Sequence, residues 1–318
     1  MSEKTTPWTA ADIPDLKGRT AVVTGATAGL GLETARMLAE RGARVLLACR
    51  NVEKAAGVVE LIHQTAPEAQ LPIVELDLSS QESVRDAAAR IRDEYDSIDL
   101  LVNNAGTMSH QRTETADGFE STLATNYLGP FAFTGLLLDL LLAAPAGRIV
   151  TVSSGTSANK SSALDVDDLF YQRRKYQQFA VYGQSKLANL LFTFELQRQL
   201  NGMDTNLVAL AAHPGAARTD FNKLLPPMLM PLTSPKVDWI FKPLLQTAEM
   251  GALPTLRAAV DPTARGGEFF GPSGRLKGYP VLNEACAAAH DPELAARLWL
   301  ESERLTGVVY SFDASVQG

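Results

Sequence analysis

Residues 19–31 read RTAVVTGATAGLG, in which a short apolar run rich in β-branched residues leads into a glycine-rich loop. The run predicts a buried strand, and apolar residues recur with helical spacing over residues 30–41. The loop glycines Gly25, Gly29 and Gly31 would let the backbone turn tightly and approach a pyrophosphate at the helix N-terminus. A glycine turn that binds nothing looks the same, but the position at the first strand-to-helix junction favours a dinucleotide site.

Segments of strand and helix character continue to alternate along the chain. We expect further strands at residues 44–48, 73–76, 98–102, 148–152 and 206–211, and further helices at residues 52–65, 80–95, 116–143 and 183–200. This alternation predicts an α/β fold with a doubly wound parallel sheet, helices on both faces and right-handed crossovers. No internal repeat or linker divides the chain, so we expect a polar extension at 1–17 and a single domain over 18–318.

Two irregular segments, residues 155–180 and 219–247, interrupt the second half of this pattern. Both follow predicted strands, and ligands in this architecture bind beyond the carboxyl ends of the strands. We interpret the first as an active-site insert and the second as a substrate lid. The lid hypothesis rests on apolar side chains interrupted by proline, namely Pro226, Pro227, Pro231, Pro235 and Pro243. The alternative is a helix pair packed on the core or against another subunit.

The composition narrows the classes of function. The 318 residues are 46% hydrophobic, which supports a sizeable core, and the net charge of -7 argues against a nucleic-acid surface. Cys49 and Cys286 have no paired spacing, so neither a disulfide framework nor a cysteine metal site is indicated. The polar start of the chain lacks a signal peptide or membrane anchor pattern. We therefore expect a cytoplasmic protein without a metal or membrane partner.

Residues 181–192 read VYGQSKLANLLF and place Tyr182 and Lys186 four residues apart, on one face of the predicted helix. An ammonium beside a phenol favours the phenolate, so we expect Lys186 to lower the pKa of Tyr182 and to make it a proton donor and acceptor. The same spacing recurs at Tyr171 and Lys175. We favour the first pair because apolar residues follow it at helical spacing, whereas residues 171–175 read YQRRK, a run typical of a solvated surface.

Four motifs in order make the chain similar to the short-chain dehydrogenase/reductase family over residues 17–219. TGATAGLG at 24–31 resembles the family's cofactor loop, and NNAG at 103–106 resembles the motif that closes its fourth strand. VSS at 152–154 and YGQSK at 182–186 resemble its catalytic serine and Tyr-x-x-x-Lys signatures. The resemblance implies a Rossmann-like fold and an oxidoreductase that transfers hydride to or from a nicotinamide.

The resemblance also implies a catalytic tetrad of Asn126, Ser154, Tyr182 and Lys186. Ser154 would donate a hydrogen bond to the substrate carbonyl, Tyr182 would give or take the proton, and Lys186 would also bind the nicotinamide ribose. Asn126 would hold a water that connects Lys186 to solvent. The alternatives are a serine that caps a helix and an asparagine satisfied by the backbone. We choose Ser154 over Ser153 because the family uses the second serine of this pair.

One departure from the family pattern is the separation between Ser154 and Tyr182, which is 28 positions and about double the usual interval. Spacing alone would select Tyr171. The longer gap and the continuation QSKLAN at 184–189 resemble the branch that contains retinol dehydrogenases and protochlorophyllide reductase, whose members have an insert here. The insert therefore explains the gap.

Cofactor contacts follow from the same resemblance. We expect NADP(H) over NAD(H), because LLACRN at 46–51 ends the second strand with Arg50, a candidate for the 2'-phosphate, and without a carboxylate. An exposed arginine without a ligand is the alternative. HPG at 213–215 resembles the segment over the nicotinamide, and His213 there is interpreted as structural. The other cofactor candidates are Gly25, Thr27, Ala28, Gly29, Leu30, Gly31, Asp77, Leu78, Asn104, Ala105, Gly106, Tyr182, Lys186, Pro214, Gly215 and Thr219.

These observations predict an NADP(H)-dependent carbonyl reductase or alcohol dehydrogenase that acts on an apolar small molecule. The family resemblance adds a homodimer or homotetramer. Reduction of a carbon–carbon double bond is an alternative, because the protochlorophyllide branch also retains the tyrosine and lysine. A dinucleotide-sensing protein without turnover is another, and an incomplete tetrad would indicate it.

Overall fold

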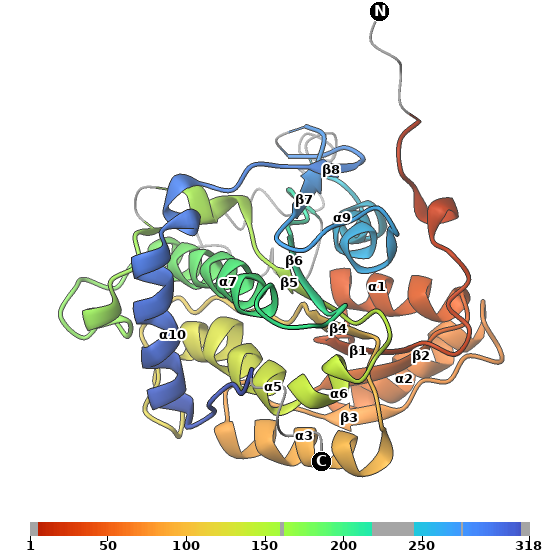
Figure 1. Ribbon diagram of the computed structural model, residues 1–318, viewed down its shortest axis with the longest axis horizontal. Coiled ribbons are helices and arrows are strands. Elements are labelled where there is room, and N and C mark those ends of the chain that lie inside the picture. The colour runs from red at the N-terminus through yellow and green to blue at the C-terminus, as the bar shows by residue number, and fades with distance from the viewer. Residues whose placement is uncertain (1–5, 160–161, 218–244, 275, 313–318) are drawn as a thin grey trace, which may run out of the picture.

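The computed structural model describes residues 6–159, 162–217, 245–274 and 276–312. These residues form one twisted sheet with the strand order β3-β2-β1-β4-β5-β6-β7-β8, in which each neighbouring pair is parallel except β7 and β8 (Figure 1). The strands are β1 (Thr20–Thr24), β2 (Arg44–Cys49), β3 (Ile73–Glu75), β4 (Leu100–Asn103), β5 (Arg148–Val152), β6 (Val208–Ala212), β7 (Phe269–Pro272) and β8 (Pro280–Leu282). The predicted α/β fold with a doubly wound sheet is confirmed.

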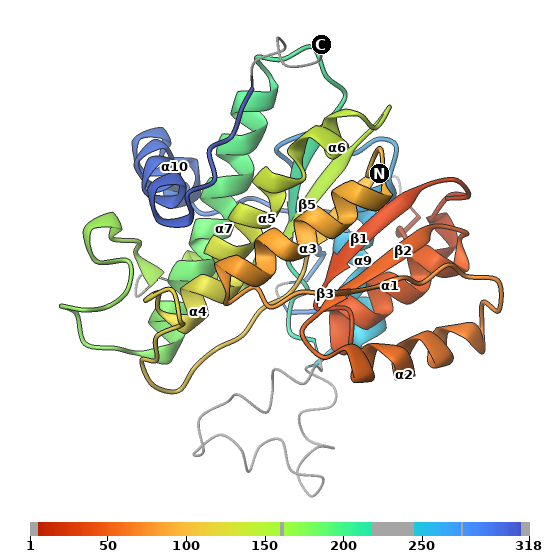
Figure 2. The same cartoon turned by 90° about the horizontal axis from the view of Figure 1, so that it is seen from below.

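Helices cover both faces of the sheet (Figure 2). One face packs on α1 (Gly29–Glu40), α2 (Val52–His63) and α9 (Ala248–Val260). The other face packs on α3 (Gln81–Glu94), α5 (Gly129–Leu136), α6 (Leu138–Leu142) and α7 (Gln178–Leu200), and α10 (Pro292–Thr306) packs on the outer side of α5 and α7. Side-chain oxygens cap several helix starts, and Asn51, Ser80, Thr247 and Asp291 each accept a hydrogen bond from a backbone N–H of the first turn.

The predicted long helix at 116–143 is wrong as a single element, because the structure divides it. It consists of α4 (Ser121–Leu123), the π-helical turn η2 (Ala124–Leu128), α5 and α6. Glu120 caps the start with both carboxylate oxygens, which accept from the N–H groups of Thr122 and Leu123. Pro130 lies in the first turn of α5, directly after the π-helical turn, and has no N–H to donate to the carbonyl groups of η2. Single-turn π segments of this kind are frequent at functional sites.

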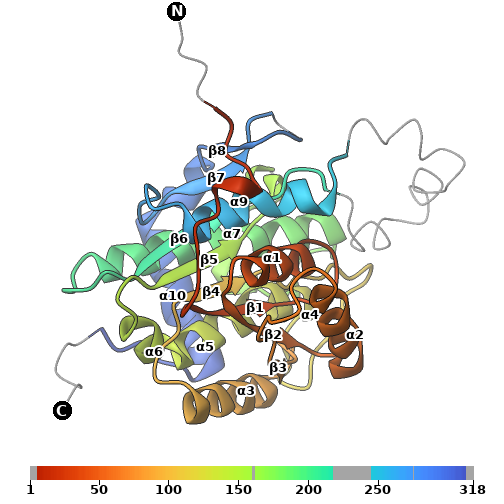
Figure 3. The same ribbon diagram turned by 90° about the vertical axis from the view of Figure 1, so that its right-hand side faces the viewer.

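The chain ends contribute to the core more than the sequence suggested. Ile13 and Leu16 are buried, although they lie in the segment predicted as a polar extension. Leu16 N donates to Arg41 O, and Arg41 donates back to Ala10 O next to the 3-10 turn η1 (Ala10–Asp12). Figure 3 shows this segment running beside α9 and α1. The sequence did not predict β7, β8, α9 or α10; β7 reads FFGP, and α9 contains Pro254.

The two predicted active-site segments differ in what is described. Residues 155–159 and 162–180 of the insert form the short turns η3 (Gly155–Ala158) and η5 (Val166–Asp168) and irregular backbone that leads into α7. Of the predicted lid, only residues 245–247 are described, and Thr219 also lies outside the described residues. The last short turn, η8 (Ala287–His290), packs beside α7.

Candidate active site

The site lies where the strand order reverses, between β1 and β4, whose neighbours run outward in opposite directions. Thr24 joins the two strand ends: its hydroxyl accepts from the N–H groups of Asn104 and Ala105, both at 3.0 Å. Asn104 Nδ2 donates in turn to Thr24 O at 2.9 Å. Gly25 has φ of +66°, and a Cβ on it would lie 2.9 Å from Ala105 Cα. A side chain at position 25 would therefore separate the two loops.

The loop between β1 and α1 has the donors that a pyrophosphate requires. Ala28 is the N-cap of α1 and has no polar side chain, so the N-cap residue leaves the first N–H groups of this helix uncapped. The helix dipole adds partial positive charge at the same end. Gly29 has φ of +54°, and a Cβ on Gly31 would clash with Gly25 O and with the Asn104 amide. The backbone of Thr27 to Gly31 therefore leaves room and N–H donors for an anionic group at this helix end.

Arg50 and Asp77 meet at the carboxyl end of β2. The Arg50 side chain is 78% exposed, and its guanidinium nitrogen lies 3.9 Å from Asp77 Oδ2. Asp77 Oδ1 accepts from the N–H and the hydroxyl of Ser79, which fixes the carboxylate. Sequence reasoning found no carboxylate at this strand end; the structure supplies one from the loop after β3. An exposed pair at this separation is worth little, so Arg50 keeps its capacity to bind a phosphate.

Leu78, a cofactor candidate in the sequence, has a buried side chain. A Cβ on Gly129 at the start of α5 would clash with Leu78 O. The close packing of α5 on this loop therefore depends on a glycine, and Leu78 could face an adenine only with its backbone.

Tyr182 and Lys186 lie one turn apart on α7, with the Lys186 ammonium 5.8 Å from the centroid of the Tyr182 ring. Lys186 is only 3% exposed, and its Nζ donates to Val152 O at 2.8 Å. Gly106, at the end of the β4 loop, is exposed, and a Cβ there would lie 3.4 Å from Lys186 Nζ. The ammonium therefore lies directly behind the loop that follows β4.

The pKa values of this pair are shifted in opposite directions. Burial raises the pKa of Tyr182 to about 12, and a hydrogen bond with Ser154 opposes the rise. Burial also lowers the pKa of Lys186 to about 8. The expected lowering of the Tyr182 pKa by Lys186 is wrong, because desolvation raises this pKa and the ammonium donates its hydrogen bond to Val152 O. Tyr182 is consequently a protonated acid at neutral pH.

The two neighbouring serines have different partners. Ser153 is buried, and its hydroxyl donates to Lys186 O at 2.8 Å, so it holds α7 on β5. The Ser154 hydroxyl accepts from the Thr156 hydroxyl at 3.1 Å and from Thr156 N at 3.3 Å, and it forms a hydrogen bond with Tyr182. Ser154 is thus both the cap of η3 and the neighbour of the phenol. The capping alternative and the catalytic one are compatible.

Asn126 is buried in the π-helical turn and uses its whole amide. Its Oδ1 accepts from Thr107 N at 2.7 Å, and its Nδ2 donates to Thr107 O and Ser185 Oγ, both at 2.9 Å. Ser185 Oγ donates to Tyr182 O at 2.7 Å. The amide therefore joins the β4 loop to the turn of α7 that carries Tyr182. Both hydrogens of the Asn126 amide already have protein partners. A water beside this residue could therefore not accept from the side chain and would have to donate to a carbonyl oxygen.

His213 follows β6, and its ring is buried. Burial lowers its pKa to about 4, so the ring is neutral near pH 7. Nδ1 accepts from Gly215 N at 3.3 Å, and Nε2 is 2.8 Å from Asn283 Nδ2. Gly215 has φ of +62°, and Pro214 O accepts from Gln246 Nε2 at 2.5 Å. These bonds are those of a structural histidine that shapes the turn at Pro214 and Gly215.

Comparisons with known proteins agree with this geometry. A family model described as short chain dehydrogenase matches residues 19–166. Retinol dehydrogenase 13 from Homo sapiens is 40% identical over 295 residues, which cover 92% of this chain and 86% of the relative. Retinol dehydrogenase 12 from Homo sapiens is 37% identical, with 92% of this chain and 88% of the relative covered. The chain belongs to the short-chain dehydrogenase family. Within it, the chain is of the retinol dehydrogenase branch.

Solved structures give the same assignment. A protein from Mycobacterium paratuberculosis matches with a TM-score of 0.79 at 40% identity, and the match covers 96% of this chain and 100% of that chain. A short chain dehydrogenase from Shigella flexneri, complexed with NADP, matches with a TM-score of 0.61 at 26% identity, over 81% of this chain and 98% of that chain. This short-chain dehydrogenase is thus an oxidoreductase of a family that uses NAD(P) and transfers hydride.

The competing pair of this short-chain dehydrogenase, Tyr171 and Lys175, lies on no helix. Tyr171 has φ of 51° and is 5% exposed, with the Arg174 guanidinium carbon 4.1 Å from its ring centroid. Burial raises its pKa. The interpretation of residues 171–175 as a solvated run is wrong for Tyr171, although Lys175 is exposed. Tyr171 packs with Ala180 and Val181 and anchors the insert.

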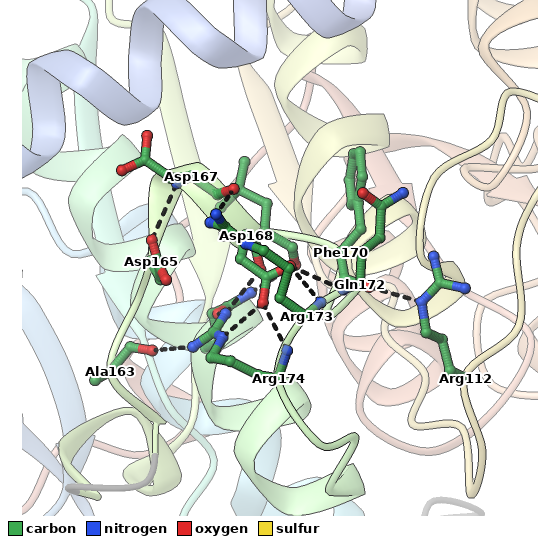
Figure 4. A network of polar contacts seen from close by, with 11 residues as sticks. Arg112, Ala163, Asp165, Asp167, Asp168, Phe170, Gln172, Arg173 and Arg174 are labelled. Carbon is green, nitrogen blue, oxygen red and sulfur yellow. Dashed lines mark hydrogen bonds and ion pairs between the residues drawn. The ribbon is translucent and has the colours of Figure 1, made fainter.

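Sequence reasoning missed the residues that hold the insert in place. Figure 4 shows the buried Asp168 at the centre of a network. Its carboxylate accepts from the backbone N–H groups of Gln172, Arg173 and Arg174 and from Arg174 Nε at 3.1 Å. Burial acts to raise the Asp168 pKa, but these hydrogen bonds lower it overall.

The same network reaches α7. Arg174 also donates to Gln184 Oε1 at 2.9 Å, and Gln184 Nε2 donates to Leu169 O. The insert is therefore bonded to the turn of α7 next to Tyr182. Arg174 and Asp168 belong to no motif, and the motif that contains Gln184 does not indicate this contact.

Two other observations bear on the expected partners. In the part of the chain that the structure describes, no three acidic, histidine or cysteine side chains gather as metal ligands would. Across the same residues, no helix combines the length and the apolar character that crossing a bilayer requires.

Proposed function

We propose that the protein is an NADP(H)-dependent carbonyl reductase or alcohol dehydrogenase that uses Tyr182 as its general acid and base. The observation that carries the proposal is the convergence of Ser154, Tyr182 and Lys186 behind Gly106, at the same edge of the sheet as the α1 N-terminus. A dinucleotide whose phosphates were held at that N-terminus would have its nicotinamide end within reach of these three residues.

Each residue then has a defined task. The nicotinamide, when bound, supplies or accepts the hydride. Ser154 and Tyr182 donate hydrogen bonds to the substrate oxygen, and Tyr182 gives its proton to that oxygen as negative charge develops. Lys186 places positive charge beside the phenol as it loses its proton. Asn126 and Ser153 hold α7 against the β4 loop and β5, so they position Tyr182 and Lys186.

The pKa values favour the reductive direction. Reduction needs a protonated tyrosine, and burial raises the Tyr182 pKa to about 12. Oxidation needs the phenolate, which at neutral pH is a minor species of a group with such a pKa. An apolar ketone or aldehyde is the proposed substrate class. The apolar composition of the predicted lid supports it.

The preference for NADP(H) is a separate part of the proposal and depends on Arg50. Replacing Arg50 by Ala should weaken NADPH binding by about 10- to 100-fold and NADH binding by about twofold at most, because charged hydrogen bonds to a phosphate contribute about 1.5–3 kcal/mol. Titration of both cofactors measures this. Arg304→Ala, an exposed arginine on α10, is the matched control. Equal losses for the two cofactors in Arg50→Ala would remove Arg50 from the role.

The test of the activity is NADPH oxidation against ketones, aldehydes and enones. Turnover with ketones or aldehydes is the expected result. Turnover with enones alone would favour reduction of a carbon–carbon double bond. Cofactor binding without turnover on the panel would favour a dinucleotide-sensing protein, although Ser154, Tyr182 and Lys186 are all in place.

Assembly and location complete the proposal. A homodimer or homotetramer is supported by β8, an outer strand of the sheet whose surroundings expose Tyr279 and Leu282. Light scattering of the purified protein measures the oligomer size, and a monomer would contradict this part. The proposed location is the cytoplasm, on the basis of the free cysteines Cys49 and Cys286. Fractionation of cells that produce the full chain tests it, and recovery in the membrane fraction would contradict it.

A further inference from the structure

We infer that Gln178, one helical turn before Tyr182, binds a second oxygen of the substrate, and that His110 orients its amide. The inference rests on the proposed function and deepens it. It narrows the substrate class to apolar ketones or aldehydes that carry an additional hydrogen-bond acceptor. Neither the family motifs nor the comparisons assign a role to either residue.

The loop after β4 and the insert contact each other beside the first turn of α7. The Tyr176 hydroxyl donates to Ser109 O at 3.2 Å and to Glu120 Oε1 at 3.3 Å. Arg112 Nε donates to Phe170 O at 2.8 Å. The Phe119 and Phe170 rings stack with centroids 5.4 Å apart. The loop after β4 and the insert are therefore fixed to each other at the place where α7 begins.

Gln178 is the first residue of α7, and only one of its two amide atoms has a hydrogen-bond partner among the described residues. Its Oε1 lies 2.8 Å from His110 Nδ1, so a neutral His110 would carry its hydrogen on Nδ1. Its Nε2 is buried, yet it has no hydrogen-bond partner among the described residues. A buried N–H group without a partner destabilises a folded protein, and native structures keep few of them. A ligand oxygen would provide the missing acceptor.

The helix geometry indicates where that oxygen lies. Gln178, Tyr182 and Lys186 occupy positions i, i+4 and i+8 of α7 and so share one face. The rise per turn is about 5.4 Å. The second oxygen should therefore lie about 5 Å along the substrate from the carbonyl that Tyr182 protonates. An ether, carbonyl or hydroxyl oxygen at this distance would accept from Nε2.

The chain offers a matched control in the preceding residue. Gln177 has the same side chain, but it is exposed and makes no side-chain cap to α7. Methionine is close to glutamine in shape and lacks the amide. Gln178→Met and Gln177→Met therefore remove the same group from neighbouring positions.

The test compares two ketones of equal length, 5-methoxypentan-2-one and heptan-2-one, in which an ether oxygen replaces a methylene. Its readout is the ratio of kcat/KM for the two ketones. Gln178→Met should lower the ratio of the ether to the hydrocarbon about fivefold relative to the unmodified protein, because a neutral hydrogen bond contributes about 1 kcal/mol. Gln177→Met should leave the ratio unchanged. His110→Ala should lower it less, since His110 acts through Gln178.

The rate with heptan-2-one is the internal control, because a folded and active Gln178→Met variant should retain it. An unchanged ratio in Gln178→Met would overturn the inference. Calorimetry of both ketones with the NADPH-bound protein gives the same ratio without turnover. If neither ketone were reduced, the proposed function would fail, and the binding ratio would still decide the role of Gln178.

Discussion

The two Tyr-x-x-x-Lys segments of the chain have the same spacing and opposite structural contexts. Tyr182 and Lys186 lie on α7, with the ammonium buried and bonded to the end of β5. Tyr171 and Lys175 lie in the insert, where the tyrosine is buried without a helix and the lysine is exposed. Four-residue spacing brings two side chains together only on a helix. The spacing is therefore necessary for the site but does not identify it.

The comparison also explains why the insert is long. Its two ends lie at Ser154 and at Tyr182, and the residues between them form a structure of their own around Asp168 (Figure 4). The insert therefore separates two active-site residues in sequence without separating them in space, because Ser154 still forms a hydrogen bond with Tyr182.

The largest expected effect is on turnover in the two tyrosine variants. Tyr182→Phe should lower kcat by about 1,000-fold or more, because only this variant removes the proton that the substrate oxygen receives. Its affinity for NADPH should stay within about twofold, because the ring remains to pack. Tyr171→Phe should change kcat by less than about threefold. Steady-state rates and cofactor titrations of both variants measure this, and an inactive Tyr171→Phe protein would reverse the assignment.

A second comparison uses the two lysines and concerns stability. The Lys186 pKa is lowered from 10.5 to about 8, so burial of its charge destabilises the fold by about 3 kcal/mol at neutral pH. Lys186→Met removes this cost and loses one hydrogen bond of about 1 kcal/mol, so it should raise the free energy of unfolding by about 2 kcal/mol while abolishing turnover. Lys175→Met should change neither quantity appreciably.

The destabilisation caused by the buried Lys186 charge should depend on pH. The cost of Lys186 is present below pH 8, where the lysine is protonated in both the folded and the unfolded chain. It disappears between about pH 8 and pH 10.5, where only the unfolded chain binds the proton. Urea unfolding of the unmodified protein and of Lys186→Met should show that the difference in their free energies of unfolding shrinks over this range. A constant difference would mean that Lys186 is not a buried cation.

A smaller effect is expected where the insert meets α7. Asp168→Asn replaces an acceptor-only carboxylate with an amide whose N–H group would face the donors of Arg174. Because Arg174 is partly exposed, the loss should be limited to about 1.5 kcal/mol of unfolding free energy. The neighbouring Asp167→Asn, whose side chain is 71% exposed, should cost less than about 0.5 kcal/mol. Equal losses in chemical unfolding would exclude Asp168 as the anchor of the insert.

The sequence predicted the parts of the molecule whose signals are local. Strand β1, the glycine loop and helix α1 follow from a contiguous pattern, and their bounds differ from the prediction by one residue. Gly25 and Gly31 were found as part of this pattern, and the structure shows that their close contacts require glycine. Tyr182 was chosen over Tyr171 because its apolar neighbours continue at helical spacing, which the structure shows as the buried face of α7.

The parts that could not be predicted depend on contacts between distant residues. The π-helical turn at Asn126 is joined to Thr107 and Ser185, neither of which is near it in sequence. The shift of the Tyr182 pKa follows from burial, which a four-residue spacing does not report. Within the insert, Arg174 belongs to no motif, and the QSKLAN motif does not indicate that Gln184 bonds to Arg174. Strand β8 is only three residues long and is a strand because it pairs with β7.

The central claim is that Tyr182 is a protonated acid, and initial rates of carbonyl reduction and alcohol oxidation between about pH 6 and pH 10 test it most directly. With a Tyr182 pKa of about 12, reduction should be independent of pH up to about 8 and should fall above it as Lys186 loses its proton. Oxidation should be slow at pH 7 and should rise with pH. A reductive rate that rises with pH, or an oxidation rate that is maximal near pH 7, would contradict the account.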